Sequence, residues 1–339
     1  MDQTTDKYHM SQNRIFLSLT AVLLAFLFGF AVLSGKSALP VSAADASYIK
    51  WVDFGVTAAA MSDAMALDIE SYGTDEHVSW TSLLAYLGAK YGGNFKSYQK
   101  ADLVYAAENL KKDPACFDGM KYYSYYKKAY GAVLDGFLGT YAVYENTDGR
   151  YRYKEKYGLK AFSPIARGYY YSDFDDFGAS RSYGYRRHHL GHDMMGSVGT
   201  PIVAVESGYV EAVGWNQYGG WRIGIRSFDG KRYYYYAHLR KDHPYNDMYE
   251  GKIVTAGEVI GYLGMTGYST RENTNNINTP HLHFGIQLIF HPDQKDGTNQ
   301  IWIDCYEIAK FLSQNRSAVY RENGEYYAVA PITDFSIPD

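Results

Sequence analysis

Histidine is the side chain most often used to bind zinc or to move protons near neutral pH, and this chain concentrates it in one region. Eight of its ten histidines lie between His188 and His291. They include three local groups, His188-His189-Leu190-Gly191-His192-Asp193, Tyr236-Ala237-His238-Leu239 and His281-Leu282-His283-Phe284. Catalytic zinc sites commonly use three nitrogen or oxygen ligands and leave a fourth position open, and these groups contain enough such ligands.

Spacing within the third group indicates that its two histidines act together. Residues two apart in a strand point to the same side, so His281 and His283 should share one face. In the first group, residue type and spacing leave His188, His189 and His192 equally open as the ligand. A lone strand histidine is usually only a hydrogen-bonded neighbour, whereas three groups in one small domain favour a metal site. His243 and His291 belong to no group and are expected to be ordinary surface or loop residues.

The histidine groups lie among short segments with strand patterns. Hydrophobic residues alternate on both sides of Asp229-Gly230, which predicts a hairpin with a two-residue turn. Residues 202–205, 209–213 and 259–263 supply further short strands. The region is therefore expected to be mostly antiparallel β structure in two packed sheets, like a sandwich.

The segment before this β region has helical spacing. Apolar residues recur every three or four positions between residues 48 and 145, and Gly92-Gly93 and Asp113-Pro114 interrupt the pattern as stops or turns. After the β region, residues 302–313 have helical spacing, and Asn323-Gly324 predicts a last small hairpin. The fold class expected is α+β, with several domains.

The N-terminal residues predict export. Residues 15–34 are almost all apolar and are long enough to cross a bilayer, and Lys7 and Arg14 before them favour a cytoplasmic N-terminus. Val41-Ser42-Ala43-Ala44 resembles a signal-peptidase site but lies far beyond the apolar run, which favours an uncleaved anchor. We expect a single-pass membrane protein with an extracytoplasmic catalytic domain, or a secreted or cell-wall protein if cleavage occurs near Ala43.

The expected organisation follows from these patterns. It comprises a cytoplasmic tail (1–14), a transmembrane or signal segment (15–34), a linker (35–47), a helical domain of unknown role (48–145), a second linker (146–160), a peptidase domain (161–292) and a C-terminal helix and hairpin (293–339).

Composition excludes several classes of protein. A net charge of −4 over 339 residues does not indicate a nucleic-acid binder. The two cysteines, Cys116 and Cys305, are too few and too far apart for a disulfide framework or a metal knuckle. The 36 tyrosines are typical of tyrosine-rich strands and also of surfaces that contact polymers.

Several motifs resemble those of the lysostaphin-like (LytM-type) zinc peptidoglycan endopeptidases. His189-Leu190-Gly191-His192-Asp193 is similar to the HxGxD motif of that family and His281-Leu282-His283 to its HxH motif. The similarity runs in the family's order from about Gly184 to Leu288 and leaves the helical region uncovered. It implies that His189, Asp193 and His283 hold zinc and that His238 and His281 are the catalytic pair.

Two departures from the family pattern lie beside these motifs. Glycine stands at Gly285, where the family often has glutamate, and residues 268–280 form a longer and more Asn-rich link than usual. Neither change touches a ligand position. Both can reshape the groove and therefore the substrate preference.

The resemblance implies a zinc-bound water that attacks the scissile carbonyl of a peptide bond in peptidoglycan. His281 is expected to take the proton of that water, and His238 to stabilise the oxyanion or help protonate the leaving nitrogen. The expected partners are peptidoglycan peptides, the membrane through the N-terminal segment, and a regulatory protein at the helical domain, but not nucleic acid.

Three other functions are alternatives to this one. A non-catalytic lysostaphin-like scaffold or activator that binds wall or a partner is the main alternative, although all five motif positions are filled here. A biotinyl or lipoyl carrier would need a lysine at a hairpin tip, where this chain has Gly264-Met265-Thr266-Gly267. A carbohydrate-binding wall protein would explain the tyrosines but not the histidine motifs. The bond that is cut stays open among glycine bridges, stem peptides and direct cross-links.

Overall fold

A computed structural model describes residue 49 and residues 52–182, 186–295 and 299–338. The predicted tail, membrane segment and linker at residues 1–47 lie outside these residues. Within the described ranges, no helix has both the length and the apolar character needed to cross a bilayer. Residues Ile49–Asp339 group together as one compact unit, so the domain boundaries within them stay a prediction from the sequence.

Helices occupy the region where helical spacing predicts them, and a shorter one follows near the C-terminus. They are α2 (Ala58–Ser71), α3 (Trp80–Tyr91), the 3-10 helix η2 (Phe95–Ser97), α4 (Lys100–Lys112), α5 (Tyr123–Leu134), the 3-10 helix η3 (Pro292–Gln294) and α6 (Tyr306–Leu312). Gly92 ends α3 in the left-handed conformation with φ of 61°, which glycine adopts at no steric cost. Asp113 ends α4 directly before Pro114, as predicted.

The β part is antiparallel throughout the described strands. The strands are β1 (Leu138–Thr147), β2 (Arg150–Leu159), β3 (Ser180–Ser182), β4 (Arg186–His188), β5 (His192–Met195), β6 (Pro201–Val203), β7 (Gly208–Asn216), β8 (Gly220–Ser227), β9 (Arg232–Ala237), β10 (Ile253–Val254), β11 (Val259–Tyr262), β12 (His281–Leu288), β13 (Ile301–Ile303), β14 (Val319–Glu322), β15 (Glu325–Ala328) and β16 (Thr333–Asp334). The hairpins predicted around Asp229-Gly230 and Asn323-Gly324 are confirmed as β8–β9 and β14–β15.

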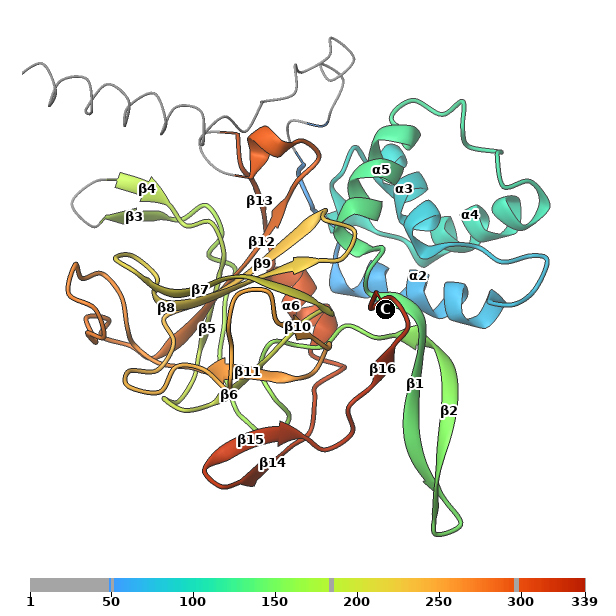
Figure 1. Ribbon diagram of the computed structural model, residues 1–339. Helices are drawn as coiled ribbons and strands as arrows, with labels where there is room; N and C mark the ends of the chain where they lie inside the picture. The colour runs from blue at the N-terminus through green and yellow to red at the C-terminus, as the bar shows by residue number, and fades with distance from the viewer. Residues whose placement is uncertain (1–48, 50–51, 183–185, 296–298, 339) are drawn as a thin grey trace, which may run out of the picture. The chain divides into compact units, whose positions relative to one another are not determined.

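A seven-stranded sheet forms the centre of the β part, with the path β10-β7-β8-β9-β12-β13 and with β5 also paired to β12 (Figure 1). The second layer is smaller than a full sandwich sheet, because β6 and β11 form a ribbon of only two strands. One side of the large sheet packs on this ribbon and on α6, and its core-facing residues include Ile223, Ile225, Tyr234, Tyr236 and Phe284. The opposite side is left to form the groove described below.

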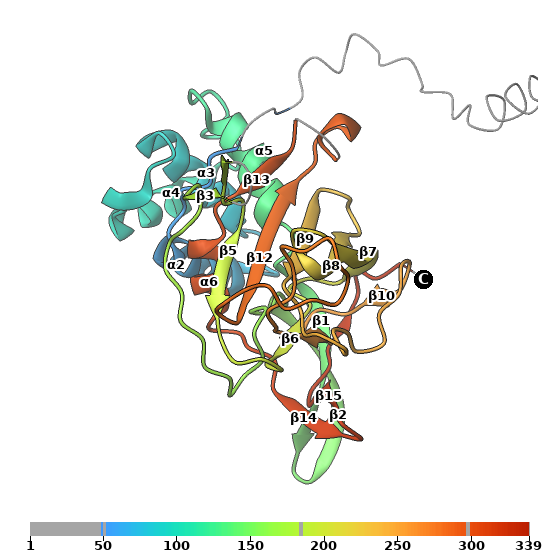
Figure 2. The ribbon, with the colours of Figure 1, turned by 90° about the vertical axis from the view of Figure 1, so that its left-hand side faces the viewer.

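Strand β12 is the element on which the site depends. Its first half, from His281 to Phe284, pairs with β5 on one edge, and its second half, from Ile286 to Leu288, pairs with β13 on the same edge. Strand β9 occupies the other edge. Figure 2 shows β5 and β12 side by side. The C-terminal segment therefore contributes a strand to the central sheet, and the helix predicted at 302–313 begins only at Tyr306.

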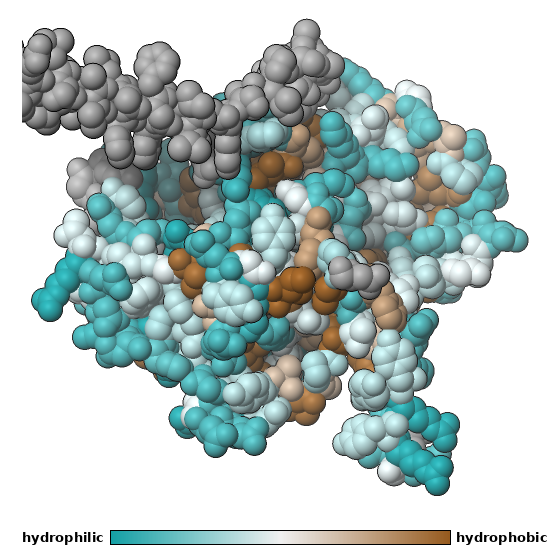
Figure 3. Space-filling model, in the orientation of Figure 1, coloured by the Kyte–Doolittle hydropathy of each residue, from teal (hydrophilic) through white to brown (hydrophobic). Residues whose placement is uncertain are grey.

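The prediction of a linker at residues 146–160 was wrong. These residues include the end of β1, the turn and all of β2 in a hairpin of two ten-residue strands, whose register runs from Leu138 opposite Leu159 to Thr147 opposite Arg150. The stretch looked like a linker because its outer side chains are polar, whereas Asp148-Gly149 is the two-residue turn of a hairpin. Both turn residues have positive φ. The hairpin extends away from the rest of the compact unit, and its outer half is largely hydrophilic (Figures 1 and 3).

A buried arginine joins the helical region to the central sheet. Arg232 on β9 is 2 % exposed, and its Nη1 donates to the carbonyl of Ala132 in the last turn of α5 at 2.7 Å. Its Nε and Nη2 donate to the two carboxylate oxygens of Glu206 at 2.7 and 3.0 Å. A Cβ on Gly136 would lie 1.8 Å from Glu206 Oε1, so glycine is required where the chain leaves α5. The helices are thus held to the sheet by a fully paired buried charge.

Replacing Arg232 by alanine should destabilise the protein by about 3–5 kcal/mol, because Glu206 would be left buried without its partner. Urea unfolding followed by circular dichroism measures this loss. The exposed Arg152 on β2 offers a matched control, and Arg152→Ala should change the free energy of unfolding by less than about 0.5 kcal/mol. A loss below about 1 kcal/mol for Arg232→Ala would show that the network does not hold the two regions together.

Candidate metal centre

The pairing of β5 with β12 brings three potential ligands together. Asp193 lies directly opposite His283 in this register, and His189 lies in the turn just before β5. His189 Nε2 is 3.1 Å from Asp193 Oδ1 and 2.9 Å from His283 Nδ1, and His283 Nδ1 is 3.0 Å from Asp193 Oδ1. One ligand atom from each residue therefore lies within 4.8 Å of the others. The structure gathers the three residues named as zinc ligands from the sequence.

The glycine between His189 and Asp193 has a packing reason. A Cβ added to Gly191 would lie 2.6 Å from Nε2 and Cε1 of His283 and 2.8 Å from the carbonyl oxygen of Phe284. Any larger residue would push β12 or the His283 ring out of place. The HxGxD spacing thus lets the turn before β5 lie directly against the ring that it must meet.

A carboxylate behind His189 fixes which ring nitrogen faces the other ligands. Asp176, which is 3 % exposed, places its Oδ2 3.1 Å from His189 Nδ1. The backbone carbonyl oxygen of Asp176 also lies 3.1 Å from Nδ1, so the Nδ1–H donates to Asp176, and when the ring is neutral its Nε2 lone pair is directed at His283 and Asp193. Arg181 on β3 holds the assembly from the other side, because its Nη2 lies 2.7 Å from Asp176 Oδ2 and 3.3 Å from Asp193 Oδ2. Such outer partners orient the ligands of metal sites.

The electrostatic environment favours charge on Asp193 and a neutral His283. Burial opposes ionisation of Asp193, but hydrogen bonds from His189 and His283 hold its pKa well below the usual range. Burial lowers the pKa of His283 despite the carboxylate beside it. Burial also opposes protonation of His189, yet its bonds to Asp176 and Asp193 raise the pKa of that imidazole to about 9. A metal ion must therefore displace a proton from His189 at neutral pH.

The two remaining motif histidines lie beside the three ligand candidates. His281 Nδ1 is 2.8 Å from the carbonyl of Thr279, and His238 Nδ1 is 2.9 Å from the carbonyl of Thr266. Each Nδ1–H therefore donates to the backbone, and each Nε2 is left as an acceptor. The His238 ring centroid lies 4.8 Å from that of His281 and 5.8 Å from that of His283. Burial and the neighbouring imidazoles hold the pKa of His238 well below its usual value.

The other histidines of the region are not gathered into this cluster. His188 is exposed and bonds the carbonyl of Gly178, and His192 is buried with its Nε2 2.9 Å from Asp173. His243 pairs with Glu325 at 2.6 Å. His291 lies in a loop, as expected, and caps η3. It is buried there and not on the surface.

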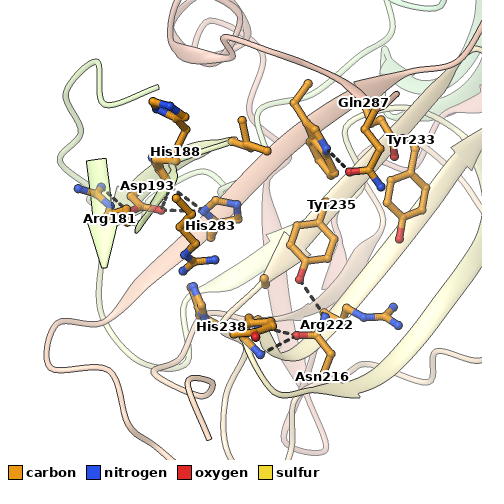
Figure 4. A pocket seen from close by; sticks show the side chains of 18 of the residues that line it. Arg181, His188, Asp193, Asn216, Arg222, Tyr233, Tyr235, His238, His283 and Gln287 are labelled. Atoms are coloured by element: carbon orange, nitrogen blue, oxygen red, sulfur yellow. Dashed lines mark hydrogen bonds and ion pairs between the residues drawn. The ribbon is translucent and has the colours of Figure 1, made fainter. Parts of the chain in front are cut away.

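The five clustered residues line a groove of about 1050 Å³ on the open side of the central sheet, and Figure 4 shows Asp193, His238 and His283 toward one end of it. Its floor consists of alternate residues of β8, β9 and β12, because side chains in a strand alternate between the two faces. Tyr233, Tyr235 and Gln287 belong to this floor, and Trp302 of β13 also lines the groove. An extended polymer segment can lie across such a surface with one of its bonds beside His281.

The donor set suits zinc. It combines two imidazole nitrogens with one carboxylate oxygen and leaves the side toward the groove open, which is the pattern of catalytic zinc sites. Calcium and magnesium prefer shells made of oxygen alone. The residues present therefore fit the metal that the sequence motifs imply.

The sequence profile of Peptidase family M23 matches residues 187–297, which contain all five clustered residues. This stretch of the chain is therefore a peptidase M23 domain.

Curated relatives match part of the chain. An L-Ala–D-Glu endopeptidase of Bacillus subtilis (strain 168) is 35 % identical over 155 residues, which cover 45 % of this chain and 43 % of the relative. Lysostaphin of Staphylococcus staphylolyticus is 42 % identical over 97 residues, which cover 28 % of this chain and 18 % of the relative. The chain thus spans less than half the length of the curated relatives it matches.

A solved structure shares the fold over a larger part. The LytM protein of Ruminococcus gnavus ATCC 29149, to which a glycyl-glycine endopeptidase activity is ascribed, superposes with a TM-score of 0.50 at 21 % identity. The match covers 80 % of this chain and 92 % of that chain. The fold likeness therefore extends beyond the M23 domain.

Several residues of the site were not predicted from the sequence. Asp176 lies 13 residues before His189 in an acidic stretch, and nothing in the spacing distinguishes it from Asp173 or Asp175. Arg181 and Arg222 are single arginines in polar or mixed surroundings. Only the alternation along β8 could have placed Arg222 on the same face as the tyrosines of β9.

Removing the carboxylate behind His189 should weaken metal binding. Asp176→Asn should raise the dissociation constant for zinc about 10–100-fold, because His189 Nδ1 loses its charged acceptor and keeps only neutral amide and carbonyl oxygens. Competition with a chromophoric chelator measures this constant. Asp173→Asn is the matched control, since Asp173 contacts His192 and no clustered residue, and it should change the constant less than about twofold. Equal zinc affinities for the two variants would contradict the role given to Asp176.

Proposed function

We propose that this protein is a zinc-dependent endopeptidase that hydrolyses peptide bonds of peptidoglycan outside the cytoplasmic membrane. The convergence of five side chains at one end of an open groove carries the proposal. His189, Asp193 and His283 present three ligand atoms, and His238 and His281 leave their Nε2 atoms free beside them. The names of the relatives add support, since they describe endopeptidases acting on L-Ala–D-Glu and glycyl-glycine bonds.

Zinc, when bound, supplies Lewis acidity and makes water a nucleophile near neutral pH. The protein residues must then move protons and stabilise charge. His281 Nε2 lies 3.7 Å from Asp193 Oδ1, so it faces the space beside the ligand cluster. Its Nδ1–H is held by the carbonyl of Thr279, which makes Nε2 the basic atom. His281 is therefore assigned as the general base that accepts the proton of the attacking water.

His238 is assigned to the oxygen that gains charge during the reaction. Its side chain is held in a fixed position, because Nδ1 bonds Thr266 and its backbone has a φ of 62°, in the left-handed region. Backbone strain of this kind persists where the surroundings determine the conformation, and it is common at active sites. The depressed pKa keeps the ring neutral at rest, so Nε2 must first gain a proton during the reaction; His238 can then donate it to the charged oxygen or pass it to the leaving nitrogen.

The location of the enzyme is part of this proposal. Residues 15–34 supply an apolar segment of bilayer length, and peptidoglycan lies outside the membrane. An enzyme held by such an anchor would act on the wall of its own cell. A regulatory protein bound at the helical region remains part of the same proposal.

Purified protein should contain about one zinc ion per chain and should release new amino groups from purified cell wall. A chelator should abolish this release, and added zinc should restore it, because the proposed chemistry requires the metal. Metal analysis and an amino-group assay provide the two readouts. Wall digestion that persists without bound metal would contradict the proposal, and a protein that binds neither zinc nor wall would do so as well. Wall binding without cleavage would favour the non-catalytic scaffold.

The two histidine roles separate in a pair of variants. His281→Ala should retain zinc and lose at least about 100-fold in turnover, since general-base catalysis typically contributes 10²–10⁴-fold. His283→Ala should lose zinc as well as turnover, because it removes a ligand. Zinc content and hydrolysis are measured on the same preparations. Normal turnover by zinc-loaded His281→Ala protein would refute its assignment as the base.

A further inference from the structure

The groove carries a positive charge that the proposed hydrolysis does not use. Five cationic side chains line it, and only two carboxylates do. The cations are Arg181, Arg187, Arg222, Arg226 and Lys295, and the carboxylates are Asp193 and Glu211. The whole chain has the opposite sign, with a net charge of −4. Charge of one sign concentrated in a cleft attracts ligands of the other sign.

Within the described part of the chain, Arg187 and Arg222 are the two groove cations without a carboxylate partner, and Arg222 also has no aromatic ring stacked against its guanidinium. Among the described residues, no Asp or Glu oxygen lies within 4.0 Å of its guanidinium nitrogens, and its Nη1 has no hydrogen-bond acceptor. The side chain is half-buried on the groove side of β8 and lies beside Tyr235 and Asn216 (Figure 4). Leaving a half-buried guanidinium unpaired costs stability, which is a reason to expect a ligand there.

Each of the other cations has a carboxylate or an aromatic ring against it, although Arg187 Nε and Arg226 Nη1 are buried without an acceptor. Arg226 Nε lies 2.7 Å from Glu211 Oε2, and Lys295 Nζ lies 2.8 Å from Glu211 Oε1. Arg181 is held between two carboxylates, and the Arg187 guanidinium lies over the rings of Tyr218 and Tyr268 at 5.7 and 5.0 Å. Arg222 is therefore the position at which an incoming anion would find a guanidinium with neither a carboxylate nor an aromatic ring against it.

The sheet register places Arg222 at a defined distance from the metal centre. His283 on β12 pairs with Ala237 on β9. On the other side of β9 lies β8, where Ile223 pairs with Tyr236. The hydrogen bond from Leu239 N to Trp221 O continues this pairing of β8 beyond Ile223. Arg222 thus lies two strands from His283. At about 4.8 Å per strand this is roughly 10 Å. An extended peptide covers about 3.3–3.6 Å per residue, so the anion would lie within about three residues of the bond that is cut.

The surroundings of Arg222 favour a peptide carboxylate as that anion. Tyr235 lies beside Arg222 on the floor, and its hydroxyl accepts a hydrogen bond from Asn216 Nδ2 at 3.3 Å. Glycines at two floor positions keep the surface low, because a Cβ on Gly224 would meet Tyr233 and one on Gly285 would meet Trp302. The result is a flat aromatic floor with one planar guanidinium at its edge. Such a guanidinium pairs with a carboxylate through two parallel hydrogen bonds.

We propose that Arg222 binds a carboxylate of the substrate and that the enzyme acts on acidic stem peptides rather than on neutral glycine bridges. This inference rests on the proposed function, because it specifies the substrate of the same groove. Glycine stands at position 285 because the Trp302 ring occupies the space that a larger residue would need.

Two peptides that differ in a single group test the proposal. Both are N-terminally labelled, C-terminally amidated stem peptides of the sequence L-Ala–γ-D-Glu–L-Lys–D-Ala, and one carries the α-carboxylate of D-Glu as the free acid and the other as the amide. Binding is measured by fluorescence anisotropy with the zinc-loaded full chain carrying His281→Ala, so that the peptides are not consumed. The acid should bind at least about tenfold more tightly than the amide, and pentaglycine should bind no better than the amide.

Variants assign this preference to Arg222. Arg222→Gln should weaken binding of the acid about tenfold and leave the amide unchanged, so that the two peptides bind equally, and Arg222→Lys should keep part of the difference. Arg152→Gln is the control, since Arg152 is exposed on the β1–β2 hairpin and does not line the groove. Equal affinities for acid and amide, failure of both to bind, or a preference that survives Arg222→Gln would overturn the proposal.

Hydrolysis by the chain with His281 intact separates this inference from the proposed function. If the acid binds preferentially and neither peptide nor wall is cut, the peptidase assignment fails while the carboxylate site stands. If both stem peptides or pentaglycine are cut with equal kcat/KM, the peptidase stands and the carboxylate site is refuted.

Discussion

The register between β5 and β12 is the constraint on which the site depends. Asp193 and His283 lie opposite one another only because Phe284 pairs with His192 and His281 with Met195. A shift of one residue would turn every side chain of β12 to the other face, and would bury both histidines of the HxH motif in the core. The core residues Leu282, Phe284 and Ile286 prevent that shift, because they would then face the groove. Hydrophobic packing below the sheet therefore fixes the ligand geometry above it.

The residues around the cluster restrict it further. Gly191 allows the turn before β5 to approach the His283 ring, and Asp176 holds the His189 ring from behind. Carbonyls of Thr266 and Thr279 fix the rings of His238 and His281. The imidazoles of His189, His238 and His281 thus each have Nδ1 bonded to the protein and Nε2 left for the metal or the groove. Binding a metal or a substrate would then require little reordering of side chains, which is how preorganised sites reduce the cost of reaction.

Much of this arrangement could be predicted from the sequence, since it follows from local rules. Alternation placed His281 and His283 on one face, and Asp229-Gly230 and Asn323-Gly324 marked hairpins that the structure confirms. Choosing His189 over His188 and His192 needed the family resemblance, because spacing alone does not show which ring turns inward. In the structure His188 points to solvent and His192 is buried against Asp173.

The remainder depends on contacts between segments distant in sequence. The β1–β2 hairpin was mistaken for a linker, because a polar hairpin and a polar linker have similar composition. Asp176 meets His189 through a loop, and Trp302 covers Gly285 only because the C-terminal segment returns to pair with β12. The bond from Arg232 to the end of α5, which joins the helices to the sheet, links residues 100 positions apart. No periodicity in a single sequence signals such pairs.

The most direct test of the account is the position of the metal. Anomalous diffraction from crystals of the zinc-loaded protein, recorded on both sides of the zinc absorption edge, locates the ion without any assumption about function. The account predicts one strong peak bound by His189 Nε2, His283 Nδ1 and the Asp193 carboxylate, with His238 and His281 beside it and unbound. A peak on another set of side chains, or no zinc at this cluster in crystals that contain the metal, would contradict it.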